Sequence, residues 1–600
     1  MKNSIIKNYK QKSSYYFQKI NEFKKKLISI SILRFIIFLF SIISLILLIK
    51  YNIAIAITLF TVLFGLFIYL IIIYIRIKNK KELDEILQKI NDREIKCLNF
   101  NYSEFENGIE FVNNNHFYTY DLDTFGENSL FQYLNRTSTE IGKQQLANWL
   151  INPPIEKNII NERQQAIKEL KDIIDWRQQY QAYGKKYKEE GSDKEIILKW
   201  LNDKIYFSKK SIYSLGKFIF PFITIASLIL AIIGYFSFNN FFLIFIFNIT
   251  YANFELKKIN QANEQLERRV EIFKKYSYLL KLIESKNFKS GLLIKLKNQL
   301  WNNKSDANTA VIKLSRLLNL LEGKNNLLAN VFINGFFSWN IYCLIAIEKW
   351  KITYKEYIPK WFDTIQKFDA YCSLANFAYN NNEYCYPKID QSTIISAKMI
   401  GHPLLKNSHR INNDFIVKKS GDFIIITGPN MAGKSTFLRT IGVNLILARL
   451  GAPVCAEAMS FKPLKIYTSM RTNDSLSKNE SYFLAELNRF KKLFELINSD
   501  KEFFVILDEI LRGTNIQDKQ KGSKVIIEKL IINKVPGIIA THDLTISDLK
   551  NKYPDNIFDK SFEIDIEKDK IIYSYKLKNG ISKKMNAMIL MKQLGITINT

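Results

Sequence analysis

The chain has 600 residues, of which 86 are Lys or Arg and 57 are Asp or Glu, so its formal net charge is +29. This length exceeds what one hydrophobic core supports and predicts several domains. An apolar content of 47% excludes a disordered or collagen-like chain. The positive charge indicates a polyanionic partner, either nucleic acid or anionic lipid, although a coding bias would produce the same excess. The five cysteines form no C-x-x-C pair, which argues against a disulfide framework or a structural zinc site and fits a reducing, cytoplasmic setting.

The first 77 residues combine a basic segment with two apolar segments. Residues 1–26 carry eight lysines and one glutamate. Apolar residues then run from Phe35 to Ile49, or from Leu27 if Arg34 snorkels, and again from Ile53 to Ile75 without a charge. The second run is long enough to span a bilayer. Basic flanks on both outer ends predict a transmembrane hairpin over 27–77 with both ends in the cytoplasm. The alternative is a pair of buried helices in a soluble domain.

A second uncharged segment occupies residues 218–250, with a turn at Asn239-Asn240. Its first arm just reaches the length of a span, and its second arm is shorter. Lysines on both sides repeat the first pattern and favour membrane association. Spanning the bilayer, dipping into it and packing as a buried core all stay open.

In the rest of the chain, the spacing of apolar residues changes near residue 401. Apolar residues at a spacing of three or four predict helices within 139–200, 255–330 and 355–380. Beyond 401, short apolar runs alternate with helical segments, which predicts an α/β domain with a largely parallel sheet. These runs include 423–426, 503–507 and 537–540.

The most specific motif is a phosphate-binding loop. The residues from Gly428 to Ser435 fit G-x-x-x-x-G-K-[ST], follow an apolar strand and precede a helical segment, which is the context the motif requires. In such a loop, backbone N–H groups hold the phosphates, Lys434 reaches the β and γ oxygens, and Ser435 binds Mg²⁺. The predicted ATP-binding residues here are Gly428, Pro429, Asn430, Met431, Ala432, Gly433, Lys434, Ser435 and Thr436.

Two later strands end in residues suited to the same chemistry. Residues 503–509 end in Asp508, which suits a Mg²⁺ ligand, and Glu509, which is placed to orient or deprotonate the attacking water. Residues 538–542 end in His542, a candidate sensor of the γ-phosphate. Each motif also has a non-functional interpretation: the acid pair could cap the next helix, and the histidine could belong to the core. The phosphate-binding loop earlier in the chain favours the functional interpretation of both.

The run Thr427-Gly-Pro-Asn-Met-Ala-Gly-Lys-Ser-Thr-Phe-Leu-Arg439 resembles the P-loop of the MutS mismatch-recognition ATPases. Further stretches resemble the same family: 401–405, 451–456, 507–514 and Thr541-His542 in the ATPase part, and 121–126, 134–139, 142–150, 159–170 and 368–375 in the helical lever part. The resemblance implies ATP and Mg²⁺ as cofactors, DNA as a partner, and a homodimer with composite ATPase sites. It also implies that Ser481, in Asn479–Glu486, reaches the partner's γ-phosphate from a helix N-terminus; an ordinary N-cap serine is the alternative.

The sequence also departs from the family. The N-terminal mismatch-reading domain with its Phe-x-Glu wedge has no counterpart, and the clamp is shortened. Leu511 stands where the family usually has Gly, Tyr575 stands for the adenine-stacking histidine and can still stack, and the aromatic residue before the P-loop is lost near Arg410-Ile411. Lys583–Ala587 replaces a Ser-rich element. Despite these departures the residues for ATPase chemistry are retained, whereas the sequence does not support mismatch reading by an inserted aromatic residue.

We therefore expect a multidomain protein with a transmembrane helical hairpin, a mostly α-helical lever-like domain and a C-terminal α/β P-loop ATPase domain of the ABC type. The expected parts are a basic cytoplasmic N-terminus (1–26), the hairpin (27–77), a linker (78–120), the lever-like domain with its inserted apolar hairpin (121–400) and the ATPase domain (401–600).

Three functions compete. The first is a DNA-binding ATPase at the cell membrane, with its lever and ATPase domains on the cytoplasmic side and Lys-rich helices holding DNA phosphates. The second is a membrane mechanoenzyme that acts on a protein or lipid. The third is an ABC transporter subunit, which the sequence disfavours because no Leu-Ser-Gly-Gly-Gln-like signature is present.

Overall fold

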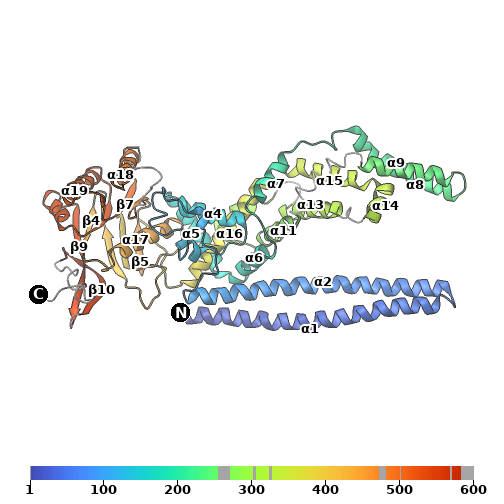
Figure 1. The fold of residues 1–600 in the computed structure, drawn as a ribbon, viewed down its shortest axis with the longest axis horizontal. Helices are drawn as coiled ribbons and strands as arrows, with labels where there is room; N and C mark the ends of the chain where they lie inside the picture. The colour runs from blue at the N-terminus through green and yellow to red at the C-terminus, as the bar shows by residue number, and fades with distance from the viewer. Residues whose placement is uncertain are drawn as a thin grey trace.

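The computed structural model describes residues 2–253, 270–301, 306–322, 327–471, 482–499, 502–567 and 570–582. The molecule is elongated, with an α/β domain at one end, a helical domain next to it, and a long pair of antiparallel helices beside the helical domain (Figure 1). The multidomain, mostly helical architecture predicted from the sequence is confirmed, with mixed sheets in the C-terminal region.

The chain begins with two long helices, α1 (Lys2–Leu48) and α2 (Ile53–Leu98). Asn52 begins α2 by accepting hydrogen bonds from the backbone N–H groups of Ala54 and Ile55. The basic segment 1–26 continues without a break into the apolar segment of α1. Likewise, residues 78–98, expected as part of a linker, belong to α2. Each helix therefore has an apolar half beside the turn and a polar half beside the helical domain.

The polar halves are fixed to the helical domain by buried hydrogen bonds. Glu94 of α2 forms an ion pair with Arg136, with 2.5 Å between Oε1 and Nε, and both side chains are buried. The Asn380 side chain donates to the second Glu94 oxygen at 2.8 Å, and the Tyr9 hydroxyl of α1 donates to Asn380 at 2.9 Å. The hairpin is thus held by groups from both ends of the helical domain's sequence.

The helical domain is organised around its last helix, α16 (Ile358–Asn380), most of whose side chains are buried. Its Asp369 accepts hydrogen bonds from the backbone N–H groups of Ser138 and Thr139, at the start of α4. A Cβ atom on Gly142 would lie 2.2 Å from the Asp369 carboxylate, so this close approach requires glycine. The domain's other helices are α3 (Leu130–Leu134), α4 (Glu140–Ile151), α5 (Lys157–Asp172), α6 (Ile174–Lys186), α7 (Asp193–Asn202), α11 (Val270–Ser285), α12 (Gly291–Asn298), α13 (Ala307–Glu322) and α15 (Trp339–Tyr354), preceded by the short η1 (Ile109–Phe111).

The predicted apolar pair at 218–250 forms a second helical hairpin, α8 (Ser211–Ile232) and α9 (Phe238–Asn253). A third apolar helix, α14 (Leu327–Phe337), packs against both and was not singled out from the sequence. This group lies at the end of the molecule farthest from the sheets, as does the turn between α1 and α2 (Figure 1). By length and composition, α1, α2 and α8 could each cross a membrane, and so could 331–337 and 339–354 if they form one bent span.

The C-terminal domain contains two sheets. In the six-stranded sheet, β9–β10 is antiparallel and the other neighbours are parallel, in the order β10-β9-β4-β8-β7-β6. The runs predicted as strands lie in β4 (Phe423–Thr427), β7 (Phe503–Asp508) and β8 (Gly537–Thr541), which are adjacent. The remaining strands of this sheet are β6 (Lys465–Ser469), β9 (Ile557–Glu567) and β10 (Lys570–Asn579), and the helices are α17 (Lys434–Arg449), α18 (Tyr482–Ser499), α19 (Ile516–Ile532), α20 (Leu549–Lys552) and the short η4 (Leu544–Asp548).

The smaller sheet has the order β1-β5-β2-β3. It contains β1 (Lys388–Ile389), β2 (Ile395–Ile400), β3 (Asn413–Val417) and β5 (Ala458–Phe461). Two of these strands precede residue 401, so the fold of this domain begins earlier than the sequence resemblance placed it.

A polar junction joins the helical domain to the α/β domain. The Asp121 carboxylate accepts hydrogen bonds from the Thr468 hydroxyl at 2.6 Å and from the backbone N–H of Arg471 at 3.0 Å. Arg439, on the helix that follows the glycine-rich loop, donates to the Asp121 carbonyl at 3.1 Å. A displacement of that helix would therefore be transmitted to the first residues of the helical domain.

Candidate nucleotide-binding site

The glycine-rich loop connects β4 to α17, in the strand–loop–helix context that the motif requires. Two of its glycines have left-handed backbones, Gly428 with φ 152° and Gly433 with φ 98°. A Cβ atom on Gly428 would lie 2.6 Å from the carbonyl oxygen of Phe562, and one on Gly433 would lie 2.9 Å from the Tyr575 ring. The loop's course past β9 and β10 thus depends on both glycines.

Lys434 is the first residue of α17, and its side chain folds back over the loop. Its ammonium group donates to the carbonyl oxygens of Gly428 at 2.8 Å and Pro429 at 3.0 Å, and lies 3.3 Å from His542 Nε2. Burial lowers the pKa of Lys434, while the nearby Glu509 and Asp508 carboxylates oppose that effect. The cation is therefore held inside the loop by weak carbonyl acceptors, which a phosphate oxygen can replace.

Ser435 and Asp508 meet across the same loop. The Ser435 hydroxyl donates a hydrogen bond to the Asp508 carboxylate, which lies at the end of β7. Burial raises the pKa of Asp508 in spite of that hydrogen bond. A buried carboxylate next to a hydroxyl offers the oxygen ligands that Mg²⁺ prefers.

Glu509 and His542 form a pair at the ends of the adjacent strands β7 and β8. His542 Nε2 lies 2.8 Å from Glu509 Oε1. The hydrogen bond from His542 is the main reason why the pKa of Glu509 falls to about 2. The two residues proposed from separate motifs are therefore in direct contact, and Glu509 is held as a carboxylate.

The turn after β7 has an uncommon backbone. Glu509 and Leu511 have φ values of 46° and 60°, although neither is glycine, and the Leu511 side chain is buried. Glu486 of α18 supports this turn by accepting hydrogen bonds from the backbone N–H groups of Leu511 and Arg512. The left-handed backbone at 511 explains physically why glycine suits this position in similar sequences.

A cavity of about 750 Å³ opens beside the loop. Tyr575 lies on its wall, 41% exposed, with its ring next to Gly433 and parallel to that of Tyr573 at 5.8 Å. The cavity is lined in addition by residues from the segment before the loop that the sequence analysis did not assign to the site, namely His402, Leu405, His409 and Ile411. Of these, His402 and Leu405 lie in the Gly401–Leu405 stretch, and Ile411 lies where the sequence analysis found the family's aromatic residue to be lost.

Most predicted site residues thus meet in one place. Asn430, Met431, Thr436 and Glu509 line the same cavity as Gly433, Lys434 and Ser435, and Ala432 is buried in the loop. Ser481 and the segment Lys583–Ala587 lie outside the described residues, so their predicted roles stay predictions.

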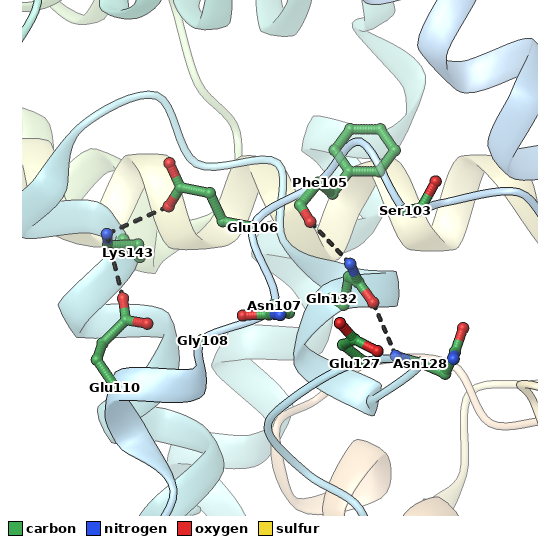
Figure 2. A pocket seen from close by; sticks show the side chains of 10 residues that line it. All are labelled: Ser103, Phe105, Glu106, Asn107, Gly108, Glu110, Glu127, Asn128, Gln132 and Lys143. Carbon is green, nitrogen blue, oxygen red and sulfur yellow. Dashed lines mark hydrogen bonds and ion pairs between the residues drawn. The ribbon is translucent and has the colours of Figure 1, made fainter.

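Another cavity, of about 500 Å³, lies in the helical domain away from this loop (Figure 2). Its lysine, Lys143, forms ion pairs with Glu106 and Glu110, both at 3.2 Å. Because these carboxylates already neutralise the lysine, this cavity is poorly suited to phosphate, and we assign nucleotide binding to the cavity at the glycine-rich loop.

Comparison with known families supports the resemblance in two separate regions. The sequence model for MutS domain III matches residues 112–375, and that for MutS domain V matches residues 424–597. The helical domain and the α/β domain each correspond to one of these ranges, whereas α1 and α2 precede both.

Individual relatives agree with this assignment. Human MutS protein homolog 4 is 32% identical over 234 residues, which cover 37% of this chain and 24% of that protein. The DNA mismatch repair protein MutS of Thermotoga petrophila is 30% identical over 247 residues, covering 40% of this chain and 30% of that protein. The MutS of Finegoldia magna is 32% identical over 234 residues, 38% of this chain and 27% of that protein. The chain thus spans less than a third of the length of these relatives, and on both domain matches it belongs to the MutS family.

Proposed function

We propose that this protein is a membrane-anchored MutS-type ATPase that binds DNA as a dimer and couples ATP hydrolysis to movement of its helical lever. The observation that carries the ATPase proposal is the meeting of Lys434, Ser435 and Glu509 at one cavity, with Asp508 bonded to Ser435 and His542 bonded to Glu509. Three separate sequence segments supply these groups.

The donor set fits a nucleoside triphosphate with Mg²⁺. The backbone N–H groups of residues 430–433 and the N-terminus of α17 offer donors for phosphate oxygens. Ser435 and Asp508 would hold Mg²⁺, which when bound neutralises developing charge on the phosphates. The Tyr575 ring, with Ile411 and His409 on the same cavity, offers a surface on which an adenine base can stack.

In the proposed reaction, Lys434 exchanges its two loop carbonyls for phosphate oxygens. Glu509 then orients the attacking water or accepts its proton. While Glu509 is paired with His542 it is a weak base, because a carboxylate with a pKa of about 2 binds protons poorly. We infer that His542 turns toward the γ-phosphate and releases Glu509 for this step.

The partner proposals follow from the family. Family members bind DNA and work as dimers, and we propose a homodimer in which Ser481, which directly precedes α18 in the sequence, completes the partner's site. The net charge of +29 suits a phosphate-dominated contact with DNA. We propose that these contacts are made to the DNA backbone, so that mismatched or branched DNA would be recognised by shape.

We further propose that the apolar halves of α1 and α2 cross the cell membrane, with the lever and ATPase domains on the cytoplasmic side. Supporting this, the apolar half of each helix exposes large side chains, among them Phe35, Ile57 and Val62, and only about a tenth of it is buried. Basic residues flank the pair at its cytoplasmic ends.

A second function, a membrane mechanoenzyme without DNA, is favoured by one observation. The far end of the lever is formed by the apolar helices α8, α9 and α14 and presents no charged side chain from residues 218–253 or 327–347. Such a surface is poorly suited to DNA phosphates. In this alternative, ATP-driven lever movement would act on a lipid or protein partner.

Steady-state ATPase measurements on the detergent-solubilised protein test the first proposal. The rate is compared without DNA and with homoduplex, mismatched and branched DNA at two salt concentrations. Stimulation that weakens with salt supports DNA as the partner, because phosphate contacts release counterions. An active ATPase that ignores every DNA would instead favour the mechanoenzyme. In the same assay, Lys434→Ala should abolish nucleotide binding; retained hydrolysis would contradict the assignment of the site.

A further inference from the structure

We propose that the tip of the lever, formed by α8, α9 and α14, is itself embedded in the bilayer that holds the α1–α2 hairpin. We call this three-helix group the lever tip. The inference rests on the proposed membrane location and goes further, because it makes the moving part of the protein, and not only its anchor, a lipid-contacting body.

The lever tip buries polar side chains together with a small apolar cluster, and it exposes many large apolar side chains. Thr224, Asn248 and Ser338 are at most 1% exposed. In contrast, Phe222 is 73% exposed and Leu243 is 66% exposed. A helical bundle in water has the opposite distribution, because large apolar surface is removed from solvent. A bilayer removes this surface from water without requiring it to be buried in protein.

The buried polar groups form hydrogen bonds between helices. The Asn248 side chain of α9 donates to the Gly335 carbonyl of α14 at 2.7 Å and to the Thr224 hydroxyl of α8 at 3.3 Å. The Ser338 hydroxyl donates to the Asn248 side-chain oxygen at 2.5 Å. Where lipid surrounds a bundle, the hydrophobic effect cannot hold helices together, and contacts of this kind replace it.

The break between α14 and α15 also fits a low-dielectric setting. The chain bends by 73° at this point, where Ser338 has φ 47°. The backbone N–H of Asn340 donates a hydrogen bond to the Asn334 side-chain oxygen at 2.9 Å, and the Asn248 side chain donates one to the Gly335 carbonyl. A broken helix is tolerated at membrane depth only where its freed backbone groups find partners in the protein.

Length and charge define how deeply the lever tip would enter. The uncharged part of α8 after Lys217, residues 218–232, extends about 22 Å, so the lever tip would enter the hydrocarbon core, which is roughly 30 Å thick, without crossing it completely. Lys217, the lysine that borders the uncharged part of α8, lies with its ammonium group 5.6 Å from the centre of the Tyr342 ring of α15. Tyr213, Tyr251 and Tyr342 occupy the same end, as aromatic residues do at membrane interfaces.

Both apolar bodies extend toward the same end of the molecule. The turn of the α1–α2 hairpin and the turn between α8 and α9 both lie at the end opposite to the sheets (Figure 1). One bilayer lying across the long axis can therefore receive both, which makes lipid the occupant that the geometry favours over a second copy of the chain.

Site-directed spin labelling of the full-length protein in vesicles of neutral and anionic phospholipid tests this proposal. Single cysteines replace Phe222 and Phe332 in the lever tip, Ile57 in the anchor, and Ile109, which is 64% exposed in the helical domain. The wild-type protein gives the background from its five cysteines, of which four are buried. Each label's relaxation is measured with oxygen, which concentrates in lipid, and with a water-soluble nickel complex.

We expect labels at 222, 332 and 57 to respond to oxygen and not to nickel, and a label at 109 to respond to nickel. Nickel access at 222 and 332 with oxygen access at 57 would overturn the lever-tip proposal and leave the anchor standing. Nickel access at 57 would overturn the anchor itself. Protection of 222 and 332 from both reagents would show protein contact, such as a second copy, and would also refute the proposal.

Discussion

Replacing Glu509 with Gln tests the catalytic assignment most directly, because the substitution keeps the shape of the side chain and removes its charge. In the structure, Glu509 Oε1 lies 2.8 Å from His542 Nε2, and this hydrogen bond is the main cause of a pKa near 2. A general base contributes about 10²- to 10⁴-fold to a rate. We therefore expect Glu509→Gln to lower ATP turnover by about that factor while ATP still binds.

The same pair predicts an effect on stability. A fall in pKa from 4.5 to about 2 corresponds to about 3 kcal/mol of interaction with the ionised carboxylate. Because 21% of the Glu509 side chain is exposed, solvent screening reduces this figure, and we expect Glu509→Gln to lower the free energy of unfolding by about 1–2 kcal/mol at pH 7. The contribution is fully present above the unfolded-state pKa near 4.5 and declines as the pH falls toward 2, so the difference between the proteins should shrink below pH 4.5.

Two measurements on each protein separate these effects. Turnover is followed by phosphate release, and binding by fluorescence of a labelled ATP analogue. Glu528→Gln is the matched control, because Glu528 pairs with Lys552 on the surface of the same domain and should change neither quantity. Wild-type turnover by Glu509→Gln would refute the assignment of the general base. Loss of ATP binding would show instead that Glu509 supports the loop.

Three further predictions address the anchor, the nucleotide pocket and the lever tip. Glu94→Ala leaves the buried Arg136 without its carboxylate and should lower the free energy of unfolding in detergent by about 3–5 kcal/mol. Glu104→Ala, which removes the exposed ion pairs with Arg93 and Lys96, should lower it by less than about 1 kcal/mol. Tyr575→Ala should weaken ATP binding by about 5- to 100-fold by removing a stacking surface, and Tyr575→Phe should restore it; equal titration curves for all three proteins would exclude stacking. Asn248→Val removes three side-chain hydrogen bonds, to Gly335, Thr224 and Ser338, and should lower both the thermal midpoint in detergent and the free energy of unfolding, the latter by about 1 kcal/mol. Asn240→Val at the exposed tip should change neither, and an unchanged midpoint for Asn248→Val would contradict the proposed polar core.

The sequence predicts the nucleotide site better than its surroundings. The strands β4, β7 and β8 are short, uninterrupted apolar runs, which are easy to recognise in the sequence. The motif residues lie at the ends of these strands. Because parallel strands place their carboxyl ends at the same edge of a sheet, the motif residues meet there. The small sheet was missed because its strands are short and partly exposed, with alternation too brief to separate them from loops. The place of His409 and Ile411 on the cavity wall could not be predicted for a related reason: the segment before the loop is brought to β10 by tertiary contacts, such as the hydrogen bond from Asn413 to the Tyr575 carbonyl, which no local pattern encodes.

The sequence pattern also did not predict that α1 is one continuous helix. Residues 1–26 and 27–48 differ sharply in composition, but both lysine-rich and apolar side chains allow helical backbone hydrogen bonds, so α1 continues across the boundary. Similarly, α14 was overlooked because its apolar run is short and adjoins α15 across a bend, so that neither piece alone has the length of a span.

The unbroken helices α1 and α2 have an electrostatic consequence for the whole protein. From the end of the apolar segments to the Glu94–Arg136 contact, their polar halves extend about 30 Å, since each residue adds about 1.5 Å. This distance is several times the Debye length of about 8 Å at physiological salt. With the apolar halves in a bilayer, the field of charged lipid headgroups would reach Lys24, Lys25 and Lys26 and fade before it reached the α/β domain. Lipid charge would then govern how firmly the protein is seated, while the chemistry at the glycine-rich loop would proceed in an environment set by the bulk electrolyte.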